Sequence, residues 1–217
     1  MPLRDQVRQG RAALAVLALV IVLTGGWLAF GPLPAHALAL LNRGRAAAGV
    51  PALRVPAAYW GWSADRQLVW VINAERAARG LPLARVSHAL NGAVAQGIAT
   101  DADPNPNAYY PGVQQSESIW AWVPTPGLTR RRVGADLLQI DDLWVYQDGW
   151  SGASTSNIDC TSPHALGCWG HRDVVLGDVP GTTLVVVPGV ATHWHGADPG
   201  VGAAAIFVWT TVPTALR

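Results

Sequence analysis

Residues 182–212 have the sequence "TTLVVVPGVATHWHGADPGVGAAAIFVWTTV" and carry the strongest signal for the fold class. β-Branched and aromatic residues are concentrated in residues 182–195 and 203–212, a composition typical of strands. The stretch "GADPGVG" between them is rich in turn-forming residues. The pattern predicts two strands near the C-terminal end of the chain.

The sequence before these strands contains helical patterns. Apolar residues recur at helical spacing in three longer stretches, residues 63–80, 87–100 and 128–149. Shorter helical stretches are expected at residues 38–48 and 170–177. Helices first and strands last predict an α+β domain in which helices cover an antiparallel sheet.

Residues with capping preferences mark the ends of these helices. Ser63 or Asp65 can cap the first long helix, and Gly80 stands where a left-handed residue would end it. Ser87 is expected to cap the second long helix, and Gly149 to end the third. Side-chain chemistry and apolar spacing therefore predict the same boundaries.

The composition limits the class of protein. A chain of 217 residues is long enough for one domain of ordinary size and a short additional segment. Half of the residues are hydrophobic, so a well-packed core is expected, and only 13% are charged. The formal net charge is +1, which provides no basic field for nucleic acid, and we expect no nucleic-acid partner.

The N-terminal segment has the features of an export signal. Three arginines precede an uncharged apolar run at residues 12–30, and Ala35 and Ala37 follow in A-x-A spacing. This order predicts a secretory signal peptide over residues 1–37. The alternative is an uncleaved transmembrane anchor, because about 20 apolar residues can cross a bilayer.

Both alternatives place the remainder of the chain outside the cytoplasm, since the basic residues precede the apolar run. The protein is then secreted, or it is anchored to the outer face of the cytoplasmic membrane. The membrane would be a partner only through an uncleaved N-terminal segment. We expect residues 38–62 to form a helical and irregular lead-in, and residues 63–217 to form the domain.

The two cysteines of the chain, Cys160 and Cys168, are close in sequence. In an exported protein such a pair favours a disulfide, which would close a small loop and stabilise the fold by about 2 to 3 kcal/mol. The alternative is a zinc site, in which His164 and His171 would complete a set of four ligands. We expect the disulfide, and therefore a closed loop that ends shortly before His171.

Ionisable residues in apolar surroundings are further candidates. Glu117 lies in the tryptophan-flanked stretch "SESIWAW", where a carboxylate needs a partner. His193 and His195 would point to the same side of a strand, a spacing that can hold a metal, although a solvent-facing strand end is the expected interpretation. The candidate metal ligands are thus His171, His193 and His195. We expect no cofactor, with zinc or calcium as the ions to consider.

Several motifs occur in the order found in one known family. "INAERAARGLPL" resembles the helix end that begins bacterial, actinobacterial-type domains of the CAP superfamily, the cysteine-rich secretory, allergen and pathogenesis-related (SCP-like) proteins. "SESIWAW" is similar to the G-E-N-I-like segment of that family, and Glu117 matches its glutamate. "GCWGHRDVVLG" is similar to its H-R-x-x-[IL]-L element, and His171 matches its histidine. The resemblance extends over residues 64–212.

The resemblance implies a three-layer α-β-α sandwich with a surface cleft. In many members two histidines and two glutamates line this cleft, some members bind a divalent metal there, and others bind sterols or lipids. Here "GIATDADPNPN" holds no histidine in the place of the first cleft histidine, and Asp148 stands where the second glutamate is expected. The implied cleft residues are Glu117, His171, Asp148 and Trp120.

The sequence supports three functional hypotheses. We expect His171 to pair with Glu117, which would keep both groups charged, and the pair would lock the fold, contact a ligand or act in catalysis. The leading hypothesis is a binding or interaction module rather than an enzyme, with a small molecule, glycan, peptide or lipid as ligand. The alternatives are a cell-envelope hydrolase, with His171 as base and Glu117 as its orienting partner, and a divalent-metal site.

Overall fold

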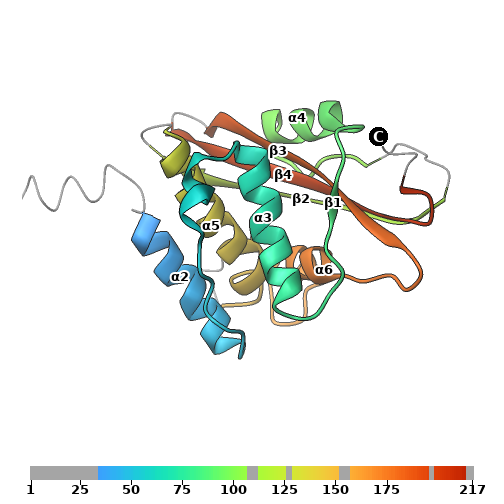
Figure 1. Cartoon of the computed structure of the whole chain (residues 1–217), viewed down its shortest axis with the longest axis horizontal. Coiled ribbons are helices and arrows are strands. Elements are labelled where there is room, and N and C mark those ends of the chain that lie inside the picture. The colour runs from blue at the N-terminus through green and yellow to red at the C-terminus, as the bar shows by residue number, and fades with distance from the viewer. Residues whose placement is uncertain (1–33, 107–111, 126–128, 152–156, 196–197, 214–217) are drawn as a thin grey trace, which may run out of the picture.

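A four-stranded sheet forms the middle layer of the molecule (Figure 1). The structure is a computed structural model that describes residues 34–106, 112–125, 129–151, 157–195 and 198–213. In spatial order the strands are β1 (Arg85–Val86), β3 (Thr183–His195), β4 (Asp198–Thr210) and β2 (Val113–Pro124). β3 and β4 form an antiparallel pair as expected, β2 pairs antiparallel with β4, and β1 pairs parallel with β3.

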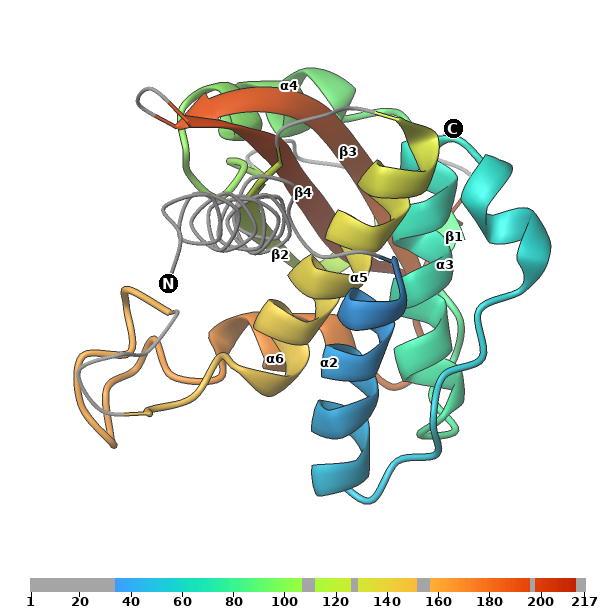
Figure 2. The ribbon, with the colours of Figure 1, turned by 90° about the vertical axis from the view of Figure 1, so that its left-hand side faces the viewer.

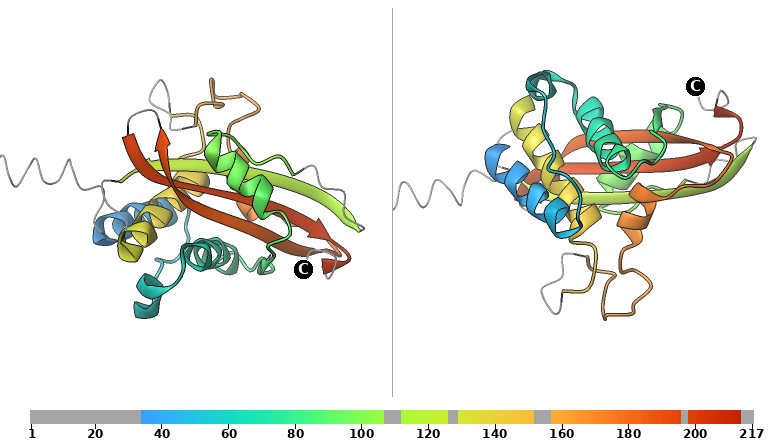
Figure 3. Two further views of the ribbon diagram at one scale, coloured as in Figure 1. Left: turned by 90° about the horizontal axis from the view of Figure 1, so that it is seen from above. Right: turned by 60° about the horizontal axis from the view of Figure 1, so that its bottom comes forward.

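Helices cover both faces of this sheet (Figure 3). One face carries α4 (Asn91–Ala99), and the other carries α3 (Ala64–Ala77), α5 (Arg130–Tyr146) and α6 (Gly170–Leu176). The chain before α3 supplies α2 (Pro34–Ala47), which packs against α5, and a short 3₁₀ helix, η1 (Ala57–Gly61). The expected α+β class is confirmed.

The central strands are apolar on both sides because each side meets a layer of helices. Phe207 of β4 faces α3, α5 and α6, whereas its neighbour Ile206 faces α4. Gly189 of β3 allows α4 to approach closely, since a Cβ at this position would lie 2.3 Å from Cγ1 of Val94. Two-sided burial explains the long run of buried residues in β4.

The segment predicted as a lead-in is part of the same folded unit. Ala37 and Leu41 of α2 are fully buried, and they share an apolar cluster with Tyr59, Val71 and Leu138. This cluster joins α2 and η1 to α3 and α5. Residues before position 63 therefore contribute to the core of the domain.

A buried ionic cluster adds to this contact. Arg45 of α2 forms an ion pair with Glu75 of α3, and Arg79 Nη1 lies 2.6 Å from Glu75 Oε2. The Tyr146 hydroxyl donates to the same carboxylate at 2.6 Å. Asp141 of α5 lies beside these groups, where burial and the charge of Glu75 raise the pKa of its carboxyl. Loss of one partner would leave a buried charge uncompensated, so charge as well as apolar area ties α2 to α3.

The structure differs from the sequence-based expectation at β2 and at the start of α4. β2 forms a long edge strand where no strand is expected, because only Ile119 and Val123 within it are fully buried and the apolar alternation is short. α4 begins at Asn91 rather than directly after Ser87. The N–H of Ser87 instead donates to Val186 O at 2.9 Å, which extends the ladder between β1 and β3.

The ends of α3 partly follow their predicted chemistry. Gly80 has a φ of 69° and lies just beyond the helix, as expected for a left-handed residue. Ser63 occupies the N-cap position, but its side chain makes no capping hydrogen bond. In α5 this bond is present, since the Thr129 side chain accepts from the N–H of Arg132 at 3.3 Å.

Within the described residues, no helix is both long enough and apolar enough to cross a membrane. The apolar run at residues 12–30, and with it most of the predicted signal segment 1–37, lies outside the described residues.

Candidate functional site

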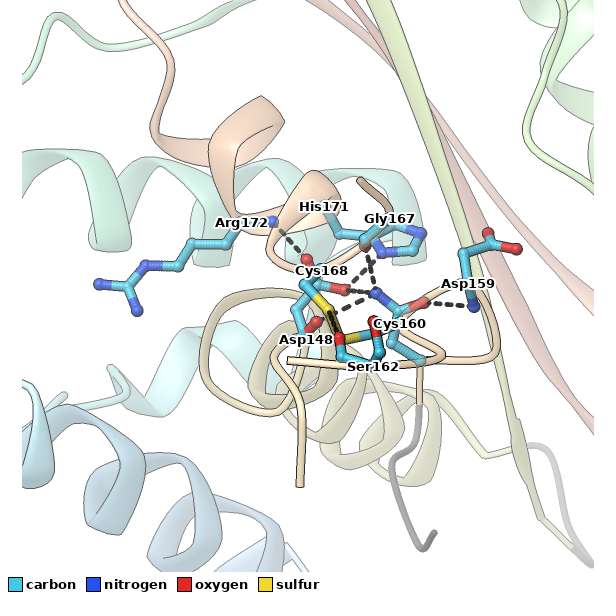
Figure 4. Close-up of a disulfide and its surroundings, with 9 residues drawn as sticks. Asp148, Asp159, Cys160, Ser162, Gly167, Cys168, His171 and Arg172 are labelled. Carbon is cyan, nitrogen blue, oxygen red and sulfur yellow. Dashed lines mark hydrogen bonds and ion pairs between the residues drawn. A yellow bond between two sulfur atoms is a disulfide. The ribbon is translucent and has the colours of Figure 1, made fainter. Parts of the chain in front are cut away.

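His171 lies in the first turn of α6, and the fold brings three aspartates near its ring. Asp148 follows the end of α5, Asp103 follows α4, and Asp159 belongs to the loop before α6. α5 and α6 pack on the same face of the sheet, so the C-terminal end of α5 meets the start of α6. Figure 4 shows Asp148 and His171 joined beside the disulfide.

Asp148 is a buried and extensively hydrogen-bonded residue of the site. Only 1% of its side chain is exposed. Its Oδ1 accepts hydrogen bonds from His171 Nδ1 and from Asn157 Nδ2, both at 2.7 Å, and its Oδ2 accepts one from the Arg172 N–H at 3.2 Å. These three donors satisfy the buried carboxylate, and the bond to Nδ1 fixes the orientation of the His171 ring.

The loop closed by a disulfide holds Asp148 in place. Cys160 and Cys168 are bonded to each other, with their Cα atoms 4.4 Å apart, and we call residues 160–168 the disulfide loop. Asn157, just before this loop, also donates to the Asp148 carbonyl at 3.0 Å and to the Gly167 carbonyl at 2.7 Å. One asparagine side chain therefore connects both ends of the loop to Asp148.

The second ring nitrogen of His171 faces Asp103. His171 Nε2 lies 3.9 Å from Asp103 Oδ1, with 22% of the histidine side chain and 51% of the aspartate side chain exposed. The backbone N–H of Trp120 donates to the Asp103 carboxylate. A donor and an acceptor thus lie next to each other at the surface, where a ligand can reach both.

The surrounding charges raise the pKa of His171. Burial alone would lower this pKa, because it disfavours the imidazolium. The hydrogen bond and the charge of Asp148, followed by the charges of Asp103 and Asp159, outweigh burial and raise the pKa above its usual value of 6.5. The imidazolium is therefore more abundant at neutral pH than in an isolated histidine.

The expected pair between Glu117 and His171 is not formed. Among the described residues, the ion pairs of His171 are with Asp148 and Asp103, and none joins it to Glu117. Glu117 lies in β2, where its Oε1 accepts a hydrogen bond from Gln115 Nε2 at 3.3 Å. The two ring nitrogens face other carboxylates instead, because the end of α5 brings Asp148 against Nδ1 and Asp103 lies on the side of Nε2.

Trp120 takes part in the site through its main chain. Its indole packs against the apolar cluster on the α4 face of the sheet. β2 is the edge strand, so the outward groups of Trp120 are available to other elements. The N–H serves Asp103, and the carbonyl accepts a hydrogen bond from Trp144 Nε1 at 3.2 Å.

Exposed apolar side chains occur within the disulfide loop and close to it in sequence, namely Trp150, Ile158, Leu166 and Trp169. The guanidinium of Arg172 lies 5.0 Å from the centre of the Trp169 ring. Exposed apolar groups that gather beside a polar site mark a surface for a ligand or partner. The tryptophans in particular can stack on a flat or ring-shaped ligand.

The described side chains do not form a metal site. No group of three or more histidine, cysteine, aspartate or glutamate side chains among them is arranged to hold a metal ion. The disulfide uses the two thiols that the zinc alternative requires, and His164 is exposed. The side chains of His193 and His195 lie outside the described part of the chain, so a metal site at this pair stays a prediction.

Three residues of the site are missing from the sequence-based set. Asp103 lies in "DADPNPN", whose composition indicates only a turn, and Asp159 directly precedes a cysteine. Asn157 offers the one usable signal, because asparagine side chains commonly bond backbone groups in loops. Its three bonds to Asp148 and Gly167 depend on the folded loop and have no pattern in the sequence.

Comparison of the chain with family models, with curated proteins and with solved structures gives no significant match. Its function is therefore inferred from the geometry of the site.

Proposed function

We propose that this chain is an extracytoplasmic binding module of CAP (SCP-like) type, which binds a cell-envelope glycan at the site formed by His171, Asp148 and Asp103. The arrangement of helices on both faces of one sheet supports the sandwich architecture. α3, β2 and α6 carry the three motifs that resemble the family, and β2 and α6 are in contact.

The observation that carries the proposal is a partly exposed donor and acceptor pair, His171 and Asp103, in which a buried carboxylate holds the histidine. Asp148 fixes the ring of His171, so Nε2 can donate to a ligand without a large loss of side-chain freedom. Asp103 can accept from a ligand hydroxyl, because half of its side chain is exposed. Adjacent donors and acceptors of this kind suit neighbouring hydroxyl groups, which sugars present.

The exposed tryptophans near the disulfide loop support the same ligand class. Trp150 and Trp169 are each 39% exposed. A sugar ring has one apolar face, and stacking of that face on an indole would complement hydrogen bonds from its hydroxyl groups. A site of this composition binds a ligand that is polar at its edge and apolar on its face.

Isothermal titration with soluble glycan strands from peptidoglycan tests the proposal. We expect H171Q and D103N to weaken binding about 10- to 100-fold, because a hydrogen bond to a charged group contributes about 1.5 to 3 kcal/mol. D173N changes an exposed aspartate of the same helix and should bind as the wild type does. Unchanged affinity in both site variants would contradict the site, and no binding by the wild-type protein would contradict the glycan.

A second candidate is a hydrolase that acts on the cell envelope. It is favoured by the 2.7 Å contact between Asp148 and Nδ1, which is how a carboxylate orients a histidine that acts as general base. In this candidate His171 Nε2 would deprotonate an attacking water, and Asp148 would take the orienting role expected of Glu117. Release of soluble sugars from purified envelope, lost in H171A and D148N, would support it. No release by the wild-type protein at any pH would exclude it.

We also propose that the N-terminal segment is retained as a membrane anchor. Cleavage after Ala37 would remove the first residues of α2, although Ala37 is fully buried in the core. Retention keeps this helix intact. The domain would then stand on the outer face of the cytoplasmic membrane.

A further inference from the structure

Arginine and tryptophan side chains gather at one end of the molecule, and we call this group the Arg–Trp end: Trp60, Trp62, Arg66, Arg130 and Arg131. The guanidinium carbon of Arg66 lies 4.2 Å from the centre of the Trp62 ring, and that of Arg131 lies 5.8 Å from the Trp60 ring. Arg130 Nη1 donates to the carbonyl of the last residue of η1 at 3.2 Å. Contacts between cations and rings therefore join η1 to the first turns of α3 and α5.

The side chains of the Arg–Trp end are all at least partly exposed to solvent, and the tryptophans are also anchored to the core. The three arginines are exposed, and the two tryptophans are half-buried. The rings of Trp60 and Trp62 lie 5.0 and 5.9 Å from the buried Tyr59 ring, which fixes their inner edges. Partly anchored indoles next to cations are the combination that favours the headgroup region of a membrane.

The arginines of this end are not held by neighbouring carboxylates of the described residues, although Asp65 precedes Arg66 in the first turn of α3. Within the part of the chain that the structure describes, Arg66, Arg130 and Arg131 form no ion pair with a carboxylate. Asp136 of α5 is buried, and burial raises the pKa of its carboxyl to about 7. Residues 38–217 contain 12 arginines and 13 acidic residues, so the cluster is a local feature of a nearly neutral chain.

The chain enters the domain at the same end. In Figure 1 the first turns of α2 and α5 and the helix η1 lie at the left-hand end, which Figure 2 views face on. α2 begins at Pro34, and only residues 31–33 separate it from the apolar run at residues 12–30. Those residues span no more than about 14 Å when fully extended.

We propose that the Arg–Trp end docks on anionic phospholipid headgroups in the outer leaflet of the membrane that holds residues 12–30. This inference rests on the retained anchor proposed above. The short connection places the end at the membrane surface, and charge complementarity selects anionic lipid, since guanidinium groups bind phosphate with paired hydrogen bonds. The tryptophans would lie at the headgroup level.

Fluorescence quenching with the full chain in lipid nanodiscs tests this docking. Both native cysteines are in the disulfide, so one introduced thiol can carry a bimane label, either at exposed Ala58 of η1 or at exposed Pro180 in the turn before β3. The discs hold one copy of the chain and a lipid spin-labelled in its headgroup. We expect A58C to be quenched in phosphatidylglycerol discs at least twice as strongly as in phosphatidylcholine discs, and P180C to be quenched weakly in both.

Two triple variants serve as a matched pair. R66Q/R130Q/R131Q removes the arginines of the Arg–Trp end and should remove more than half of the extra quenching in phosphatidylglycerol discs. R43Q/R54Q/R85Q makes the same change in net charge at exposed arginines elsewhere. This control variant should retain the extra quenching in phosphatidylglycerol discs. About 0.5 M salt should reduce the extra quenching in the parent protein, because it screens exposed charges.

Several results would overturn the inference. They are equal quenching of A58C in the two lipids, an equal effect of the two triple variants, or quenching that requires two copies per disc, which would make a second chain the occupant. A mature chain that begins at Leu38 would overturn the anchor and this docking together. Failure of the proposed glycan site can be distinguished from failure of this docking, because glycan binding is measured separately, by isothermal titration of H171Q with soluble glycan strands.

Discussion

The charge state of His171 depends on aspartates that are distant in sequence. Asp103 and Asp148 reach the ring from the ends of two different helices, and Asp159 reaches it from the loop before α6. Their combined effect on the pKa therefore exists only in the folded chain. The pKa of His171 can therefore report both whether the site is intact and how stable the fold is.

The raised pKa of His171 makes stability depend on pH. A histidine with a higher pKa in the folded than in the unfolded state contributes stability that is fully present below the unfolded value of about 6.5 and is lost as pH rises through the folded value. We expect the difference in unfolding free energy between wild type and H171Q to be largest below about pH 6 and to shrink above 6.5. Urea unfolding at several pH values measures it. A difference that grows with pH would contradict the assignment.

Single helices and loops depend on a few close approaches. Gly149 connects α5 to the segment before the disulfide loop, and a Cβ there would lie 2.1 Å from Cζ2 of Trp169. We expect G149A to lower the unfolding free energy by about 1 to 3 kcal/mol, because the ring must move. G170A is the matched control: a Cβ there meets nothing within 4 Å, so the variant should be neutral or up to about 1 kcal/mol more stable. Equal unfolding curves for the two variants would count against this packing.

The helix α2 should contribute to stability as a core element. Leu41 is fully buried, whereas Leu83 is 57% exposed. We expect L41A to cost about 2 to 5 kcal/mol, as for other buried leucines, and L83A to change the unfolding free energy by less than about 0.5 kcal/mol. Thermal and urea unfolding of the two variants measure this contrast. A small effect of L41A would mean that α2 is only loosely attached.

Some elements could be predicted from sequence and others could not. α3, α5 and the pair of β3 and β4 carry long apolar patterns with one dominant period, so their type follows from the sequence. β2 lies at the sheet edge and keeps polar side chains, which hides its alternation. α4 starts at Asn91 rather than directly after Ser87, since the Ser87 N–H extends the ladder to β3 and its hydroxyl accepts from the N–H of Ala89, outside the helix.

The molecule as a whole has two ends of different chemistry, joined by α5. Arg130 at the start of this helix belongs to the Arg–Trp end, and Asp148 beyond its end holds His171. A helix of 17 residues is about 25 Å long, so the two regions are well separated. Docking of one end on a membrane would leave the other end free to bind a ligand of the envelope.

The retained anchor predicts the mass and the location of the mature protein. We expect the mature chain to retain residues 1–37 and to remain in the membrane fraction, because cleavage after Ala37 would remove a buried part of α2. Intact-mass spectrometry of the membrane and medium fractions checks this. A chain that starts at Leu38 and is found in the medium would show a cleaved signal peptide instead.

The site residues could be named from sequence more easily than they could be paired. Motif order points to both Glu117 and Asp148 as carboxylates near His171, and both are compatible with an ion pair. Which of these two carboxylates meets His171 depends on the packing of α5 against α6, and no local sequence pattern encodes that packing. The orienting partner therefore emerges only from the tertiary structure.

The most direct test of this account is an NMR titration of the His171 Cε1–H resonance in the wild type, D148N and E117Q. The structure places the bond to Nδ1 and the largest favourable charge on Asp148. We expect a wild-type pKa above 6.5, a lower pKa in D148N, and a pKa in E117Q equal to that of the wild type. A pKa that falls in E117Q and is unchanged in D148N would contradict the site described here.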